Sequence, residues 1–139
     1  MKIYASCLAL SIGVVLSQSA LADLKPLEKI TATTTLSLPS DTEIFGVSED
    51  GAIDSFLSAK FSVSSEELGA LLEAADLDED DFEDSKRYLL GQDDDWWDPQ
   101  TPKTLPTAQK MIAPGRVLNL GVDYSSCARP VIYLVWHST

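Results

Sequence analysis

The order of segment types along the chain predicts an α+β domain: an antiparallel sheet of four to five strands packed by one or two helices. Apolar and polar residues alternate near both ends of the chain, and apolar residues at helical spacing lie between them. Strands and helices segregated in this way favour an α+β architecture over alternating βα units. Length agrees with this class, because residues 23–139 suffice for one compact domain and are too few for two.

The first 22 residues have the features of a signal peptide and are left out of the predicted domain. Lys2 supplies a positive charge, Ile3–Leu16 form an apolar run, and Ala20–Ala22 place small residues where a signal peptidase reads them. The run is short for a membrane span, and no later segment approaches the roughly 20 apolar residues that a spanning helix needs. We therefore expect a mature chain that begins near Asp23, has no transmembrane segment and is periplasmic or secreted.

Three strands are predicted in the first part of the domain. Apolar residues alternate with threonine and serine between Lys29 and Leu38, which favours a half-buried strand that ends at Pro39. A short strand is expected over Glu43–Val47, followed by a polar turn. Alternation returns over Ser55–Val63 and makes this the better strand prediction.

The clearest local signal predicts a helix from about Ser65 to Ala75. Ser64 and Glu67 have the Ser-x-x-Glu spacing of a capping box, in which side chains satisfy the free N–H groups of the first turn. Val63 and Leu68 are placed to pack together as a hydrophobic staple around it. Apolar residues then recur at helical spacing and form one stripe: Leu68, Leu71, Leu72 and Ala75.

The second half of the chain is expected to hold a helix, a long loop and two strands. The helix is predicted over Asp80–Leu90, with a glycine directly after it as a stop signal. Residues Gly91–Gly115 contain four prolines, which cannot donate in a strand ladder and resist helix, so a long, Pro-rich acidic loop is expected. The strands are predicted over Arg116–Val122 and Val131–His137, and apolar residues on both faces of the second predict a central strand.

The charge balance bears on the partners that the protein can have. The formal net charge is −12, and removal of Lys2 with the signal peptide makes the mature chain more acidic still. Binding to nucleic acid depends on neutralisation of phosphates by Lys and Arg, so no nucleic-acid partner is expected. Adsorption to anionic membranes is disfavoured by the same sign of charge. A basic protein partner remains compatible, beside the plainer interpretation that acidity serves solubility. The oligomeric state stays open.

No catalytic residue is nominated, because the constellations of known enzyme classes are missing from the sequence. Cys7 falls in the signal peptide, which leaves Cys127 without an internal disulfide partner: buried, a free thiol, or bridged to another chain. His137 is the only histidine and is expected to be a polar residue at a strand end. There is no nucleophile elbow, no phosphate-binding loop and no His-rich metal spacing.

A calcium site is a weak alternative in the acidic segment Asp76–Asp98. Three aspartates stand at the first, third and fifth ligand positions of an EF-hand loop: Asp76, Asp78 and Asp80. The match then fails twice, because Asp81 occupies the position that needs glycine and Arg87 the position that needs glutamate. A solvated acidic face is therefore preferred, and no cofactor or metal ligand is predicted.

The run between residues 93 and 98 is the predicted binding surface. It consists of four carboxylates and two tryptophans: Asp93, Asp94, Asp95, Trp96, Trp97 and Asp98. Exposed tryptophan is favoured at interaction hot spots, and acidic and aromatic groups together suit a basic partner or a stacked sugar ring. The competing interpretation is that Trp96 or Trp97 folds back as a lid on the core.

From these features we expect a small exported, non-enzymatic binding protein of the inhibitor, immunity or envelope accessory type. Its acidic-aromatic surface would recognise a protein partner. The alternative is a small secreted hydrolase that uses a carboxylate pair, with carbohydrates as one candidate substrate class. A carboxylate pair with perturbed pKa values in a deep cleft would favour the hydrolase, and a flat or convex acidic-aromatic surface would favour the binding protein.

Overall fold

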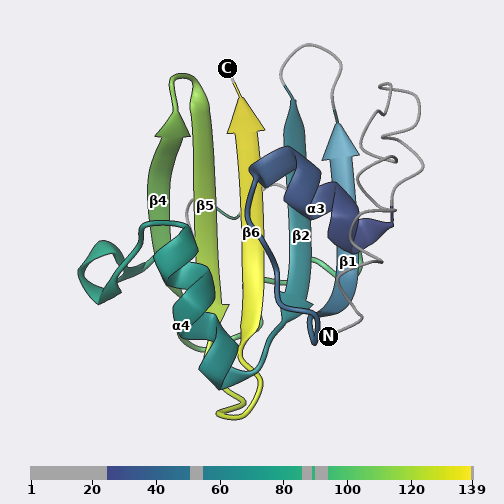
Figure 1. Cartoon of the computed structure of the whole chain (residues 1–139). Coiled ribbons are helices and arrows are strands. Elements are labelled where there is room, and N and C mark those ends of the chain that lie inside the picture. Colours follow the sequence, from purple (N-terminus) through teal and green to yellow (C-terminus); the bar gives the residue numbers. More distant parts are fainter. Residues whose placement is uncertain (1–24, 51–54, 86–88, 90–93, 139) are drawn as a thin grey trace, which may run out of the picture.

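Six strands form one antiparallel sheet in the computed structural model, which describes residues 25–50, 55–85, 89 and 94–138 (Figure 1). The strands are β1 (Glu43–Asp50), β2 (Phe56–Ser62), β3 (Glu83–Asp84), β4 (Pro106–Ala113), β5 (Arg116–Asp123) and β6 (Val131–Ser138). Their order in the sheet is β1-β2-β6-β5-β4-β3. The α+β class agrees with the sequence prediction, and the strand count is higher than the four to five expected. The predicted signal peptide, residues 1–22, lies outside the described residues.

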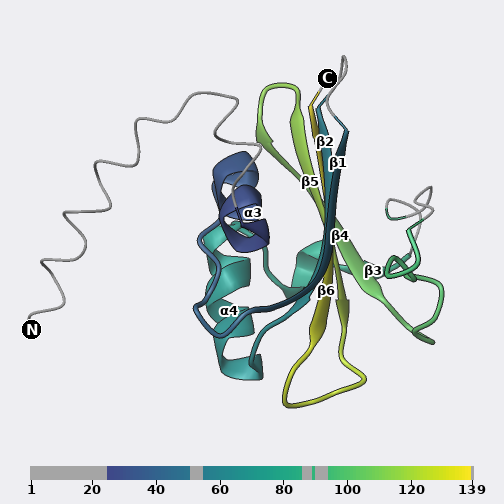
Figure 2. The ribbon, with the colours of Figure 1, turned by 90° about the vertical axis from the view of Figure 1, so that its right-hand side faces the viewer.

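Two helices cover the same face of this sheet, α3 (Pro26–Thr34) and α4 (Ser65–Ala74). Figure 2 shows both on one side of the sheet, while the described residues 94–105, which precede β4, lie on the other side. We call the first side the helical face and the second the outer face. No helix among the described residues is long and apolar enough to cross a membrane.

Helix α4 begins where the capping signal predicts. The Ser64 hydroxyl oxygen accepts a hydrogen bond from the Glu67 backbone N–H at 3.3 Å, which satisfies one free donor of the first turn. Val63 and Leu68, the two residues of the predicted staple, are both buried in the core. The helix ends at Ala74, one residue before the predicted end, so this prediction is confirmed.

The strand predicted over Lys29–Leu38 is wrong, because most of this segment belongs to helix α3. Pro26 stands in the first helical turn, where its missing N–H costs nothing. Ile30 and Thr34 are both buried, one helical turn apart, and the Thr34 hydroxyl donates to the Ile30 carbonyl at 2.7 Å. Thr35 ends the helix in the left-handed region, at φ 62°.

The helix predicted over Asp80–Leu90 is also wrong where the structure describes it. A single 3₁₀ turn, η1 (Glu79–Asp81), and the short strand β3 occupy its first half. The Asp78 carboxylate accepts from the Asp80 N–H, and the Asp81 carboxylate accepts from the Asp78 N–H, each at 2.9 Å. Reciprocal caps of this kind close a short turn and do not require a longer helix. Residues 86–88 and 90 of the predicted helix lie outside the described part.

Strand β4 occupies part of the predicted loop Gly91–Gly115. Pro106 is its first residue, a position where a strand tolerates a missing donor. Among the described residues, β4 is paired on its far side only by the two residues of β3, so it runs close to the edge of the sheet. Residues 94–105 are irregular except for turns, and residues 91–93 lie outside the described part.

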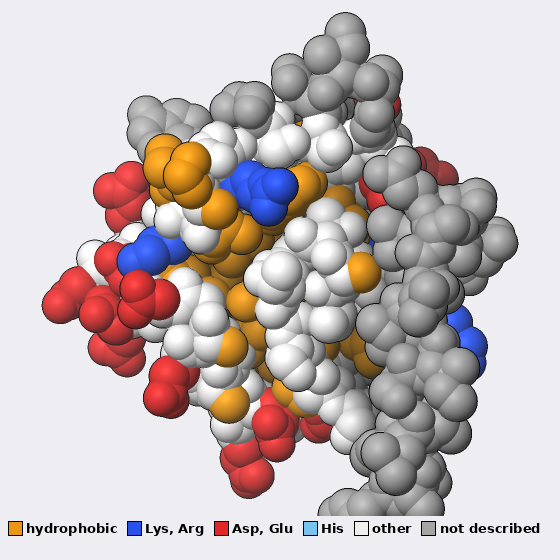
Figure 3. All heavy atoms as spheres, turned by 45° about the horizontal axis from the view of Figure 1, so that its top comes forward, with side chains coloured by type: hydrophobic (Ala, Val, Ile, Leu, Met, Phe, Trp, Pro, Cys, Tyr) orange, Lys and Arg blue, Asp and Glu red, His pale blue; other side chains and the backbone are white. Residues whose placement is uncertain are grey.

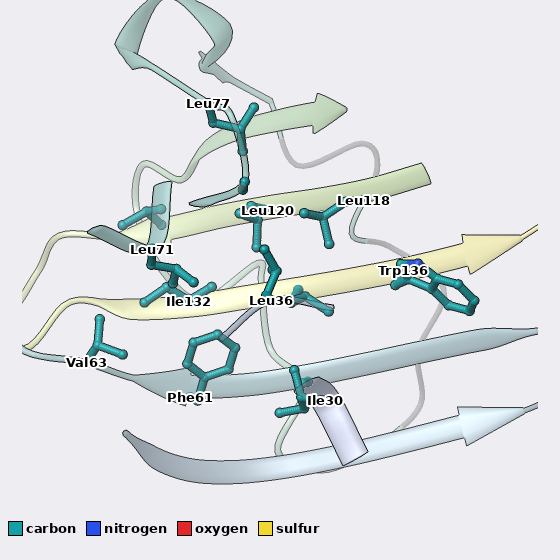
Figure 4. Packing of buried hydrophobic residues seen from close by; sticks show 14 of the residues in the cluster. Ile30, Leu36, Phe61, Val63, Leu71, Leu77, Leu118, Leu120, Ile132 and Trp136 are labelled. Atoms are coloured by element: carbon teal, nitrogen blue, oxygen red, sulfur yellow. The ribbon is translucent and has the colours of Figure 1, made fainter. Parts of the chain in front are cut away.

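The main core lies between the helices and the sheet (Figure 4). Its side chains come from both helices and from β2, β4, β5 and β6, and Figure 4 shows those of β2, β5 and β6 directed at the helices. In β6, Ile132, Leu134 and Trp136 belong to this cluster, whereas Tyr133 and Val135 belong to a second cluster on the outer face. The prediction of a central β6 covered on two sides is therefore confirmed.

The second cluster consists of Leu89, Trp97, Leu105, Tyr133 and Val135. It packs directly on the sheet at Gly121, where an added Cβ would lie 2.5 Å from a methyl carbon of Leu89. Glycine at this position therefore lets the irregular segment approach the backbone of β5. The outer face is thus covered here by the segment in which the sequence placed the binding surface.

Candidate functional site

The structure places the six predicted binding residues in different environments. Asp94 and Asp95 are exposed, Trp96 and Asp98 are half-buried, and Asp93 lies outside the described residues. Trp97 is only 6% exposed and belongs to the outer-face cluster. The run is therefore divided between an exposed part and a part that packs against the sheet.

Trp97 acts as the lid that the competing interpretation foresaw, and its prediction as an exposed contact residue is wrong. Its indole Nε1 donates to the Leu89 carbonyl at 2.8 Å. Its ring meets Tyr133 edge-on, with the ring centroids 5.4 Å apart. Such T-shaped aromatic pairs add to the stabilisation that burial provides. Trp97 thus anchors the segment to the outer face of the sheet.

Asp98 forms a second anchor through one carboxylate oxygen. This oxygen accepts from the Lys60 ammonium group at 2.7 Å and from the Tyr133 hydroxyl at 2.8 Å. Partial burial works to raise the pKa of Asp98, but the hydrogen bonds from Lys60 and Tyr133 outweigh it and the pKa falls below its usual value. Burial, and then the Asp98 carboxylate, raise the pKa of Tyr133, so its hydroxyl keeps the proton that it donates.

Replacement of Asp98 by Asn is expected to lower the free energy of unfolding by about 1.5–3 kcal/mol at neutral pH, the range for hydrogen bonds to charged groups. The lowered pKa means that the contribution of Asp98 is present above its usual pKa of 3.8 and is lost as pH falls through the folded-state value. The difference between wild type and variant should therefore shrink in acid. Urea denaturation at neutral pH and near pH 3 measures it. Exposed Asp94, replaced by Asn, is the control and should show little difference at neutral pH.

The part of the segment that remains accessible lies beside the edge strand β1. The Trp96 ring covers Gly46, where an added Cβ would collide with the indole. Phe45 is 43% exposed and sits where the β1–β2 register shifts between Ile44 and Gly46. We call the exposed and half-buried group of Phe45, Asp94, Asp95 and Trp96 the acidic-aromatic surface.

Lys60 links this surface to the anchors beneath it. Its ammonium nitrogen lies 5.7 Å from the centroid of the Phe45 ring and 5.3 Å from that of Tyr133. Both distances allow cation–π attraction. Phe45, Lys60 and Tyr133 were missed by the sequence reasoning. The one available signal was Phe45-Gly46, a large aromatic residue beside a glycine in a short strand of otherwise mixed character.

A cavity of about 420 Å³ lies near the opposite edge of the sheet, where α4, η1, β3 and the end of β5 meet. Its lining residues are Leu72, Glu79, Phe82, Glu83, Asp84, Pro106 and Tyr124. Figure 3 shows acidic side chains gathered on the side of the molecule where α4 and η1 lie. The sequence reasoning noted the acidic segment but not this cavity, because Leu72 and Tyr124 come from distant positions.

A second cavity, of about 290 Å³, lies between the ends of α3 and α4 and the second half of β4. Lys110 and Asp76 both line it and form an ion pair at 3.1 Å, and this partner raises the pKa of Lys110. Figure 3 shows hydrophobic side chains exposed in the hollow between the helices. The charges of this cavity are thus paired within the chain, which distinguishes it from the first.

The structure also locates the described residues that were considered for metal binding and for thiol chemistry. Within the described ranges, no group of three or more His, Cys, Asp or Glu side chains is arranged to hold a metal ion. Asp78 and Asp81 of the EF-hand-like run bind backbone N–H groups, and Asp76 binds Lys110. Cys127 is exposed and free in the loop between β5 and β6.

Comparison with known proteins adds no assignment. No protein-family model matches the chain, and no curated protein or solved structure matches it either. A proposal about function therefore depends on the geometry and charge of the acidic-aromatic surface and of the cavity near the β3–β4 edge.

Proposed function

We propose that this is a small exported, non-enzymatic binding protein that recognises a basic protein partner through the acidic-aromatic surface. The observation that carries the proposal is the division of the segment 94–98. Asp94 and Asp95 are exposed beside the half-buried Trp96, while Trp97 and Asp98 fix the backbone beneath them. A surface held in place before binding loses less conformational freedom when a partner docks.

The charge of the surface supports a basic partner. Asp94 and Asp95 supply two of the negative charges of a chain whose formal net charge is −12, and opposite charge on a partner would accelerate and orient the encounter. Phe45 and Trp96 supply the aromatic area that interaction hot spots commonly use. Arginine and lysine side chains can contact both kinds of group, since they pair with carboxylates and pack on aromatic rings.

The hydrolase alternative receives less support. A general acid needs a carboxyl group that holds its proton near the working pH, which requires a raised pKa. Asp98 is the most buried of the described carboxylates in the run 93–98, and its pKa is lowered because Lys60 and Tyr133 stabilise its ionised form. Its ion pair and hydrogen bond fit an anchoring role better than a catalytic one.

Replacement of Trp96 by Ala is expected to weaken capture of the partner by roughly 10-fold or more, as for a hot-spot residue, while the fold is kept. The wild-type bait, beginning at the expected mature residue Asp23, would be incubated with the envelope fraction of its own cell, and captured proteins quantified by mass spectrometry. The intact mass of the native protein from that fraction checks this starting point. Capture should also fall steeply with salt, since exposed charges are screened over about 8–10 Å at physiological ionic strength.

Two double variants provide a matched test of charge. Asp94→Asn with Asp95→Asn removes two charges from the surface, and Glu66→Gln with Glu67→Gln removes two exposed charges from the start of α4. Only the first pair should weaken capture. Equal capture by wild type, the first pair and Trp96→Ala would refute the acidic-aromatic surface as the binding site.

A further inference from the structure

The cavity of about 420 Å³ near the β3–β4 edge combines apolar walls with an acidic rim. Leu72, Phe82, Pro106 and Tyr124 provide apolar or aromatic surface, and Glu79, Glu83 and Asp84 provide carboxylates. No lysine or arginine is among the described residues that line it. Binding sites of this composition use apolar contact for affinity and a few polar groups for orientation.

The walls are fixed from three directions. Phe82 is partly buried and packs against the main core, and Leu72 does so from helix α4. Tyr124 follows β5 directly and is 52% exposed. The next turn is held by Asp123, whose carboxylate accepts from the Ser125 N–H at 2.9 Å. The backbone of Tyr124 is therefore held between the end of β5 and the turn that Asp123 closes.

The rim carboxylates are held by their backbone. Glu79 lies in η1, which the Asp78–Asp81 capping box closes. Glu83 and Asp84 form β3, which pairs with Thr107 and Pro106 of β4. Asp84 also accepts from the Leu105 N–H at 3.0 Å, which fixes one of its oxygens.

The negative charge of the rim is not neutralised by the described part of the chain. The ion pairs there join Lys29 to Glu49, Lys60 to Asp98, Lys110 to Asp76 and Arg129 to Asp41. None of them involves Glu79, Glu83 or Asp84 among the described residues. In the aromatic wall of the cavity, burial and then the negative charge of Glu79 raise the pKa of Tyr124.

We infer that this cavity binds an arginine side chain of the basic partner. The planar guanidinium group stacks on aromatic faces such as Phe82 and Tyr124 and donates paired hydrogen bonds to carboxylates such as Glu79 or Glu83. Its aliphatic stem packs against the apolar wall that Leu72 and Pro106 provide. Lysine offers a compact, strongly hydrated charge, which matches this combination of flat walls and several carboxylates less well.

The inference rests on the proposed function for the identity of the partner, but its chemistry can be tested without the partner. The probe is N-acetyl-arginine methylamide, and the matched control is the citrulline analogue, which has nearly the same shape and no charge. Both would be titrated into the ¹⁵N-labelled protein, and amide chemical shifts recorded. We expect saturable shifts at Phe82, Glu83 and Tyr124, and binding weaker by roughly 10-fold or more for citrulline.

Variants assign the binding to the cavity. Tyr124→Ala, and separately Glu79→Gln with Glu83→Gln, should each abolish the saturable shifts, and both alter exposed side chains. Trp96→Ala should bind the probe as wild type does, because it alters the other surface. Equal binding of the two probes, saturable shifts only around Asp94 and Asp95, or no saturation at about 20 mM would each refute the inference.

The two proposals can fail separately. Loss of partner capture in Trp96→Ala, with capture unchanged in Tyr124→Ala, would support the acidic-aromatic surface and refute the arginine cavity as part of that interface. Capture that is unchanged in Trp96→Ala but lost in Tyr124→Ala would refute the first site and support the second.

Discussion

Replacement of Trp97 by Ala is expected to lower the free energy of unfolding by about 3–5 kcal/mol, the range for loss of a large buried aromatic side chain. Trp97 is 6% exposed, contacts Tyr133 edge-on and donates to the Leu89 carbonyl at 2.8 Å. The variant would leave a cavity over β6 and an unpaired carbonyl group. Urea denaturation followed by circular dichroism measures the change.

Two further variants identify the source of this effect. Trp97→Phe keeps an aromatic ring but removes the Nε1 donor to Leu89, so its cost should be smaller than that of Trp97→Ala. Trp96→Ala removes a half-buried ring of the same size and should cost less still. An unchanged denaturation midpoint in Trp97→Ala would show that the outer-face cluster contributes nothing to stability. In that case Trp97 could not be the residue that fixes the backbone beneath Asp94 and Asp95, as the proposed function requires.

The elements that sequence reasoning predicted well are those whose signal is local. The Ser64 cap and the stripe that contains Leu71 identify α4 without reference to any other part of the chain. Strand β6 was identified as central because apolar residues occupy both of its faces, and each face does pack in a separate cluster. Strands β1, β2 and β5 agree with their predictions within a few residues at each end.

The errors arose where local patterns were ambiguous. Thr31, Thr33 and Thr35 alternate with apolar residues and favour a strand, yet Ile30 and Thr34 also fit a helix with one buried face. In β4, Lys110 and Ile112 lie on the helical face, so alternation of polarity does not mark the strand. Tertiary packing decided both cases, and a short stretch of sequence carries no information about the residues that it packs against.

The candidate site was predictable only in part for a similar reason. Composition drew attention to residues 93–98, but it could not distinguish the buried Trp97 from the half-buried Trp96. The distinction depends on Tyr133 and Leu89, which receive the Trp97 ring and its N–H group. The cavity near the β3–β4 edge was less predictable still, because its aromatic wall combines Phe82 with Tyr124 from beyond β5.

Replacement of Leu71 by Ala is expected to lower the free energy of unfolding by about 2–5 kcal/mol, because a buried leucine loses its transfer free energy and leaves a cavity. Leu71 is 2% exposed and points from α4 into the main core (Figure 4). Chemical denaturation gives the magnitude. An unchanged midpoint would mean that α4 does not pack on the sheet, and its apolar stripe would then be a surface for a partner.

The neighbouring residue provides the matched control for this helix. Leu72 is only partly buried and lines the cavity near the β3–β4 edge, so Leu72→Ala should destabilise the protein less than Leu71→Ala. It should nevertheless weaken binding of the arginine probe, because it removes part of the apolar wall. Adjacent leucines of one helix would then affect different measurements, unfolding for Leu71 and ligand binding for Leu72. Equal destabilisation by both, with probe binding unchanged in Leu72→Ala, would show that α4 contributes to the core and not to the cavity.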